Sequence, residues 1–254
     1  MHICSGVSSS VGRKRTRNED FPVTDDELGL FVVIDGMGGH ARGDVASKVI
    51  GETIHKIIAD TRDSDRTWPF EFDVTASLDT NRMRVAITMA DRELARRIGA
   101  DESLRGMGAT MAGVLVSDGK AVVSNVGDCR TYLVRGGTIR QVTSDHSWVA
   151  EQVRNGLIQA ADAKHHPLRN LVTRALAGGE HQVQPDLREL TLEHGDRLLL
   201  CSDGLHGLVN DDELLQRIDE FSANPQGACD TLIEMANERG APDNVTAIVV
   251  GVSR

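Results

Sequence analysis

Four aspartates, each beside an apolar run of strand-like sequence, constrain the fold of this 254-residue chain more than any other feature. They are Asp35 after FVVI, Asp128 after VVSNVG, Asp203 after LLLCS, and Asp243, which precedes NVTAIVVGV. One such residue would be a turn aspartate, but four across the whole length predict strands lying side by side with their carboxylates at one edge. Converging like charges require a cation between them, and hard divalent cations prefer oxygen ligands. The sequence therefore predicts a magnesium or manganese site.

Length and charge narrow the class of protein. A chain of 254 residues is long enough for a sizeable core but short for two typical domains, so we expect one domain over residues 1–254. A net charge of -10 argues against nucleic-acid binding and against binding to a membrane surface, because both need a basic face. No run is long enough to span a membrane, and no apolar stretch suits a signal peptide. The four cysteines form no CxxC pair, which is typical of a reduced, cytoplasmic protein.

The first third of the chain reads as strand, helix, loop and helix. LFVVI, residues 30–34, is a short apolar run expected to form a buried strand. A stripe of valines and isoleucines predicts a helix over Gly43–Asp60. Residues 60–79 lack periodicity and predict a loop, after which a second helix is expected with Thr80 as its cap and Gly99 at its end.

The remainder predicts mostly hairpins. Four strands in succession, a β-meander, are expected over Ala109–Val142, and LRELTL with RLLLCS is expected to form a hairpin. Residues 145–177 are polar, and two short helices are expected there, joined by a loop near residues 155–167. Further helices are predicted at Asp212–Ile218 and at Pro225–Arg239, the latter capped by Asn224, before a last strand NVTAIVVGV. Strands in hairpins with helices packed outside predict a layered α+β fold with antiparallel sheets.

The N-terminal RTRNED, residues 15–20, allows two interpretations. It is either a solvated charge run or part of the metal site, with Glu19 and Asp20 near the cations. In the second case Arg15 binds a phosphate, because the planar guanidinium suits bidentate contact with phosphate oxygens.

The glycine-rich DGMGGH, residues 35–40, also leaves alternatives. Gly36, Gly38 and Ala41 match a dinucleotide fingerprint between a strand and a helix. The carboxylate of Asp35 would repel a pyrophosphate there, and the chain continues as β-meander rather than as a βαβ unit. The glycines can instead bring backbone carbonyls close to a cation. His40, five residues after Asp35, is either a residue with a chemical role beside the metals or a solvent-facing residue at a helix N-terminus.

A cysteine-dependent phosphatase loop is a false match in this sequence. Cys129 and Arg135 have C-x5-R spacing, but the residues between them are β-forming. That chemistry needs backbone N–H groups curled into an anion nest, so we reject it.

Taken together, the motifs resemble one known family. RTRNED, DGMGGH, GMGATMAGV, NVGDCR, TSDHS, HPLRNLVTRAL, LLLCSDGL and APDNVTAIVV occur in the order found in metal-dependent protein phosphatases (PPM, type 2C), in their bacterial single-domain form. The resemblance covers residues 5–252. It implies a four-layer α-β-β-α sandwich of two antiparallel sheets flanked by helices, with a flap at about 145–177.

The resemblance also implies roles for individual residues. Asp35 would bridge two Mg²⁺ or Mn²⁺ ions, Arg15 would hold the substrate phosphate, and His40 would be the general acid for the leaving alcohol. Asp203 and Asp243 would complete one ion site; Glu19, the Gly36 carbonyl and, through water, Asp20 would complete the other. Asp128, helped by Asp203, would hold a third, weaker ion. Some family members carry a further acid where this chain has Gly207, which puts that third site in question.

The implied function is hydrolysis of phosphoserine and phosphothreonine in proteins by a hydroxide held between two cations, with no phospho-enzyme. The implied partners are phosphorylated proteins and a cognate Ser/Thr kinase, and a monomer is expected. One alternative is a catalytically silent phosphoprotein-binding module of the same fold. Another, from the glycine motif, is a dinucleotide-dependent oxidoreductase.

Overall fold

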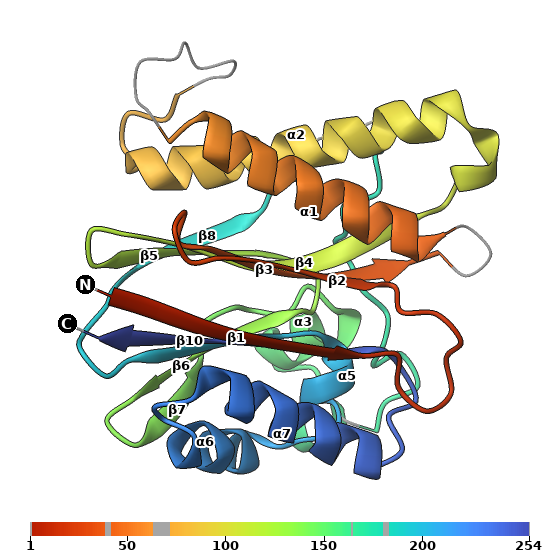
Figure 1. The fold of residues 1–254 in the computed structure, drawn as a ribbon. Coiled ribbons are helices and arrows are strands. Elements are labelled where there is room, and N and C mark those ends of the chain that lie inside the picture. The colour runs from red at the N-terminus through yellow and green to blue at the C-terminus, as the bar shows by residue number, and fades with distance from the viewer. Residues whose placement is uncertain (1, 39–41, 63–71, 164, 180–182, 254) are drawn as a thin grey trace.

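The chain folds into two antiparallel five-stranded sheets that lie face to face, with helices on both outer faces (Figure 1). The computed structural model describes residues 2–38, 42–62, 72–163, 165–179 and 183–253. One sheet has the strand order β1-β10-β9-β6-β7, and the other has the order β2-β3-β4-β5-β8. The strands of the first sheet are β1 His2–Ser10, β10 Val245–Ser253, β9 Arg197–Cys201, β6 Arg130–Arg135 and β7 Thr138–Gln141. The strands of the second sheet are β2 Asp20–Asp25, β3 Leu30–Met37, β4 Gly108–Ser117, β5 Lys120–Val126 and β8 Asp186–Thr191.

Three apolar layers hold this sandwich together. Helices α1 (Gly43–Asp60) and α2 (Leu78–Ala100) pack on the β2-to-β8 sheet through residues such as Ile50, Ile54 and Ile87. Helices α6 (Asp211–Glu220) and α7 (Pro225–Glu238) cover the other sheet (Figure 1). Between the sheets, side chains from both inner faces interdigitate. The predicted α-β-β-α layering is therefore confirmed.

Three helices differ from the prediction in their bounds: α6 covers Asp211–Glu220 rather than Asp212–Ile218, α7 ends at Glu238 rather than Arg239, and α2 differs at both ends. Helix α2 begins at Leu78, because the Ser77 hydroxyl accepts the Thr80 N–H at 3.1 Å; Thr80 is therefore not the cap. The helix also continues past Gly99 to Ala100. Helix α1 has the predicted bounds, and Asn224 caps α7 as predicted.

The predicted pairing of strands was partly wrong. The four strands of the expected meander exist, but β4 and β5 lie in one sheet and β6 and β7 in the other, because the chain crosses between sheets at residues 127–129. The expected hairpin of LRELTL with RLLLCS does not form: β8 pairs with β5, whereas β9 pairs with β10 and β6. Strands β1 and β2 were not predicted, because their sequences are too polar to show an apolar run.

Residues 145–177 form an irregular segment at one end of the sandwich. It contains α3 (Trp148–Arg154) and the short α4 (Ala160–Ala163). The 3-10 turn η1 (Glu102–Leu104) lies elsewhere, between α2 and β4. The second helix expected after residue 167 is absent from the described part of this segment, where turns and an isolated bridge between Ser147 and Val172 occur instead. A further short helix, α5 (Asp203–His206), follows β9 directly and was not predicted.

Candidate metal centre

The carboxylates of Asp20 and Asp35 face each other across a strand pair. Asp20 begins β2 and lies in register with Asp35 on β3. Asp20 is 7% exposed, and its Oδ2 accepts the Ser202 hydroxyl at 2.8 Å. The other oxygen, Oδ1, is buried and has no hydrogen-bond partner. Strand pairing alone therefore brings the two acids together, and Oδ1 of Asp20 remains without a hydrogen-bond partner.

The opposite sheet contributes Asp203, and the crossover between the sheets contributes Asp128. Asp203 begins α5 just after β9, and its carboxyl group hydrogen-bonds that of Asp35. One Asp203 oxygen, Oδ1, is also buried without a partner. Asp128 follows β5 by two residues and lies close enough to Asp35 for its charge to act on that group. Residues from both sheets thus meet at the same edge.

Asp243 lies at this edge in contact with the predicted phosphate-binding residue. The Arg15 guanidinium donates to Asp243 Oδ2 at 2.7 Å, and the two side chains are 51% and 40% exposed. The Arg15 pKa is raised above its ordinary value, first by this hydrogen bond and then by the charges of Asp243, Glu19 and Asp35. Arg15 is therefore held at the carboxylate cluster, with half of its side chain open to an incoming anion.

Glu19 and Gly36 are the remaining predicted metal ligands, and their backbones are joined by a hydrogen bond. Glu19 Oε1 accepts the Gly43 N–H at 3.1 Å, and the Gly36 N–H donates to the Glu19 carbonyl at 3.1 Å. A Cβ built on Gly36 would lie 2.2 Å from the Gly43 carbonyl oxygen and 2.6 Å from the Glu19 carbonyl oxygen. Only glycine fits this approach of three backbone segments.

We expect Gly36→Ala to destabilise the protein by about 3 kcal/mol or more, because backbone atoms at that distance cannot yield as a flexible side chain can. Urea unfolding monitored by circular dichroism measures this. Gly99→Ala is the matched control: nothing lies within 4 Å of its Cβ position in α2, and alanine is the better helix former. An equal effect of the two substitutions would contradict the close-approach reading of Gly36.

Burial and mutual repulsion raise the pKa values of the central acids. Removal from water is the largest cause at Asp20, Asp35, Asp128 and Asp203, and neighbouring carboxylates add to it. The pKa of Asp20 rises to about 7, and that of Asp128 also to about 7. The pKa of Asp35 rises well above its ordinary value. Such a cluster is unfavourable on its own and favourable around a cation.

The candidate ligands fit hard divalent cations, although in this structure they do not already surround a single metal position. Every candidate donor is a carboxylate or carbonyl oxygen, and two buried carboxylate oxygens lack partners. In the described part of the chain, no three His, Cys, Asp or Glu side chains already surround a single point. Repulsion between like charges and the bond from Arg15 to Asp243 account for this open arrangement. His40 lies outside the described residues.

Sequence reasoning missed the polar residues that support these acids. Asn244, 4% exposed, accepts the Glu19 N–H through Oδ1 at 2.8 Å and donates through Nδ2 to the carbonyls of Val11 and Arg17. It therefore ties the N-terminal segment that carries Arg15 and Glu19 to the start of β10. Ser202, between β9 and α5, and Thr246, on β10, hydrogen-bond the Asp20 carboxylate. The SDG and PDN motifs contained two of these residues, but their partners are more than 180 positions away in sequence.

Comparisons with known proteins identify the family. The family profile described as Protein phosphatase 2C matches residues 11–237. This chain belongs to the protein phosphatase 2C family. Protein phosphatase PhpP of Streptococcus pneumoniae serotype 2 (strain D39) is 31% identical over 252 residues, which cover 96% of each chain.

Solved structures show the same fold for phosphatases of this family. The Mycobacterium tuberculosis serine/threonine phosphatase PstP/Ppp superposes with a TM-score of 0.88 at 31% identity, and the match covers 100% of both chains. The catalytic domain of PstP in complex with two manganese ions superposes with a TM-score of 0.84 at 31% identity, over 99% of both chains. The predicted family and fold class are confirmed, and so is the predicted function, that of a metal-dependent serine/threonine protein phosphatase.

The alternatives from the sequence receive no support from the structure. All strand pairs between named strands are antiparallel, so β3 and α1 are not part of a parallel βαβ unit of the dinucleotide-binding kind. Cys129 is fully buried, burial raises the pKa of its thiol well above the ordinary value, and the residues after it form strand β6. The rejected cysteine-phosphatase loop is therefore absent. None of the described helices is long and apolar enough to cross a membrane.

Proposed function

We propose that Asp35, Asp203, Asp243, Glu19, the Gly36 carbonyl and Asp20 hold two divalent cations at which this phosphatase binds and hydrolyses phosphoserine and phosphothreonine. The observation that carries the proposal is the convergence of Asp20, Asp35 and Asp203 from two sheets, with two buried carboxylate oxygens left without partners. Asp35 bridges the ions because it lies between Asp20 on its own sheet and Asp203 on the other.

The residues of the chain divide the work around the phosphoryl group. When bound, divalent cations supply Lewis acidity for a nucleophilic water and positive charge for the phosphoryl oxygens. Arg15 releases Asp243 to the metal site and turns its guanidinium to the phosphate, as its half-exposed position permits. Asn244 keeps the segment bearing Arg15 and Glu19 against β10, so that phosphate and metal ligands stay in register. His40 is our proposed proton donor to the leaving alcohol.

The proposal also includes a third ion site, the identity of the metal and a flap. Asp128 holds a third, weaker ion together with Asp203, with Gly207 in place of an additional acid. Mg²⁺ and Mn²⁺ both suit the all-oxygen donor set. Residues 145–177 form a flap at the site, anchored at its base by the bidentate pair of Arg130 with Asp145, whose closest contact is 2.7 Å.

We also propose the setting in which the phosphatase acts. Its substrates are phosphorylated Ser/Thr proteins made by a cognate kinase, and it acts as a monomer in the cytoplasm. Three of its four cysteines are buried and all four are free thiols, which suits a reducing compartment. The net charge of -10 would modestly favour basic phosphopeptides. The alternative of a silent binding module loses its main argument, because Glu19, Asp35, Asp203 and Asp243 are all retained.

The direct test is hydrolysis of a phosphothreonine peptide, followed by release of inorganic phosphate. We expect turnover with Mn²⁺ and loss of turnover when a chelator is added in excess. Full activity with excess chelator would contradict the proposal, and so would the absence of turnover at millimolar Mn²⁺ in a folded sample.

Arg15→Ala is expected to lower kcat/KM for the phosphopeptide by about 10–100-fold, mostly through a higher KM. The substitution removes a charge-assisted hydrogen bond of roughly 1.5–3 kcal/mol to the phosphate. Arg17→Ala, which removes an exposed arginine two residues away, is the matched control and is expected to leave KM within about twofold. Equal KM values for the two variants would exclude Arg15 as the phosphate-binding residue.

A further inference from the structure

His146 holds Gly127, the residue before Asp128, by two hydrogen bonds. The backbone N–H of His146 donates to the Gly127 carbonyl at 2.8 Å. The ring nitrogen Nδ1 of His146 accepts the backbone N–H of Gly127 at 3.0 Å. Gly127 has a positive φ of 102°, and a Cβ there would lie 2.2 Å from the Cβ of Thr110. The backbone that presents Asp128 is therefore fixed from both sides, and His146 is one of its two supports.

The other edge of the His146 ring faces an acid on a different strand. Because Nδ1 accepts a hydrogen bond, the ring proton lies on Nε2. Nε2 lies 3.1 Å from Asp186 Oδ2 at the start of β8, but the two groups are not aligned as a hydrogen bond, so Nε2 is a buried ring nitrogen without a hydrogen-bond partner in the described part of the chain. His146 is 4% exposed, whereas the Asp186 side chain is 54% exposed. A buried ring thus connects the Asp128 segment to a side chain at the surface.

Asp186 is in turn bound by the end of the flap. Arg174 donates to Asp186 Oδ1 at 2.8 Å and to the Gln184 carbonyl at 2.9 Å. Two backbone bonds join the same part of the flap to its start: the Thr173 N–H donates to the His146 carbonyl, and the Trp148 N–H donates to the Leu171 carbonyl. Residues 171–174 therefore bond the His146 backbone directly and reach its side chain only through Asp186.

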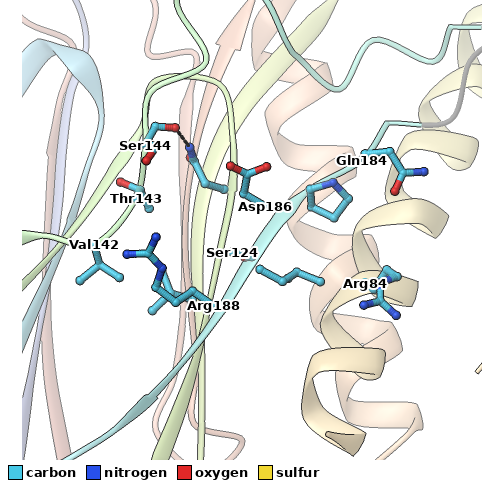
Figure 2. A pocket seen from close by; sticks show the side chains of 12 residues that line it. Arg84, Ser124, Val142, Thr143, Ser144, Gln184, Asp186 and Arg188 are labelled. Atoms are coloured by element: carbon cyan, nitrogen blue, oxygen red, sulfur yellow. Dashed lines mark hydrogen bonds between the residues drawn. The ribbon is translucent and has the colours of Figure 1, made fainter. Parts of the chain in front are cut away.

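Asp186 also lines a cavity. The cavity has a volume of about 430 Å³, and its walls include Asn125, Ser144 and Asp186 (Figure 2). Asn125, 1% exposed, donates through Nδ2 to the carbonyls of Gly127 and Ser144. This amide binds the same Gly127 carbonyl as the His146 backbone N–H, and the Asp186 side chain at the cavity wall is 54% exposed.

We propose that Arg174, Asp186 and His146 form a positioning linkage that couples the flap to Asp128. The proposal rests on the proposed function, because Asp128 matters only as a metal ligand. Coupling of this kind is reciprocal: a metal ion that fixes Asp128 must also favour one position of the flap. His146 and Asp186 touch neither substrate nor metal, and they act through Gly127.

The test measures hydrogen exchange of flap peptides 147–163 and 165–175 with and without saturating Mn²⁺. In the native sequence Mn²⁺ is expected to slow their exchange by about fivefold or more, the lower end of typical coupling between sites. Asp128→Asn is expected to abolish the part of this effect that depends on the third ion. Asp186→Ala and His146→Asn are expected to do the same. His146→Asn retains an acceptor for the Gly127 N–H and removes only the contact with Asp186, so loss of coupling there is not loss of local support.

His55→Gln is the matched control. His55 is a second histidine paired with an aspartate, with Nε2 2.9 Å from Asp25 Oδ2, but its side chain is 43% exposed and it joins α1 to β2. It is expected to keep the full Mn²⁺ effect. If His146→Asn fails to fold, Asp186→Ala still tests the linkage because its side chain is mostly exposed.

The outcomes separate the two hypotheses. Retention of the Mn²⁺ effect in Asp186→Ala, together with its loss in Asp128→Asn, overturns the linkage and leaves the role of Asp128 intact. Retention of the effect in Asp128→Asn, or its absence in the native sequence, overturns the role of Asp128 and the linkage with it. Hydrolysis of the phosphothreonine peptide reports on the two main ions independently of either result.

Discussion

Asp35→Asn is expected to produce a protein that is more stable than the native sequence without metal and inactive with it. The substitution replaces a buried carboxyl group, on which the charges of Asp20, Asp203, Asp128 and Asp243 all act, by an amide that cannot ionise. The new amide can donate to the Asp203 carboxylate, which already hydrogen-bonds this position. We expect a gain of about 1–3 kcal/mol in chelator, within the usual range for single substitutions, or a Tm higher by roughly 2–10 °C.

With Mn²⁺ present the same substitution is expected to lower kcat by about 10³-fold or more, because the residue proposed to bridge two cations becomes a neutral amide. Differential scanning calorimetry and the phosphopeptide assay measure the two effects. Asp118→Asn is the control: Asp118 lies in the exposed turn between β4 and β5, and asparagine tolerates its positive φ of 47°. Retained activity in Asp35→Asn, or a lower Tm in chelator, would contradict the role of Asp35.

The stability of the metal-free protein is expected to fall as pH rises from about 4 to above 7. From an ordinary value of 3.8, the pKa values of Asp20 and Asp128 are each raised to about 7, and burial also raises the pKa of Asp35 well above that ordinary value. In this window the folded state binds more protons than the unfolded state, so the free energy of unfolding decreases with pH. The stabilising contribution is complete below about pH 4 and is lost as pH passes through the folded-state values.

Saturating Mn²⁺ is expected to reverse this dependence, because cations compete with protons for the same oxygens and bind better as the acids ionise. The difference in Tm between Mn²⁺ and chelator should therefore grow between pH 5 and pH 8. Thermal unfolding at several pH values in both conditions measures it. A Tm difference that is constant or shrinks over this range would mean that the acids and the metal do not share a site.

The aspartates could be predicted from sequence because short apolar runs with turn residues mark strands, and an acid at each run's end marks the sheet edge. The layering of helices outside the sheets could also be predicted, because the apolar stripe of a helix marks the face that packs against a sheet. Pairing could not be predicted in the same way. EHGD between two apolar runs is typical of a hairpin, but β8 and β9 belong to different sheets, because β8 completes the ladder with β5.

What sequence reasoning could not supply are contacts between distant polar residues. β1 is rich in serine and pairs with β10 at the other end of the chain, so no local apolar signal marks it. Asn244 and His146 are ordinary polar residues in the sequence. Their importance follows from the backbone groups that they bind, namely Glu19 for the first and Gly127 for the second. Only folding brings those groups together.

An anomalous difference map from a crystal soaked in Mn²⁺, recorded at the manganese absorption edge, tests the central claim most directly. We predict two strong peaks about 3.5–4 Å apart, with Asp35 between them and Asp203 and Asp243 on one side. A map with no peak among these carboxylates at saturating Mn²⁺, or with peaks only elsewhere on the molecule, would show that the acids gather for another reason.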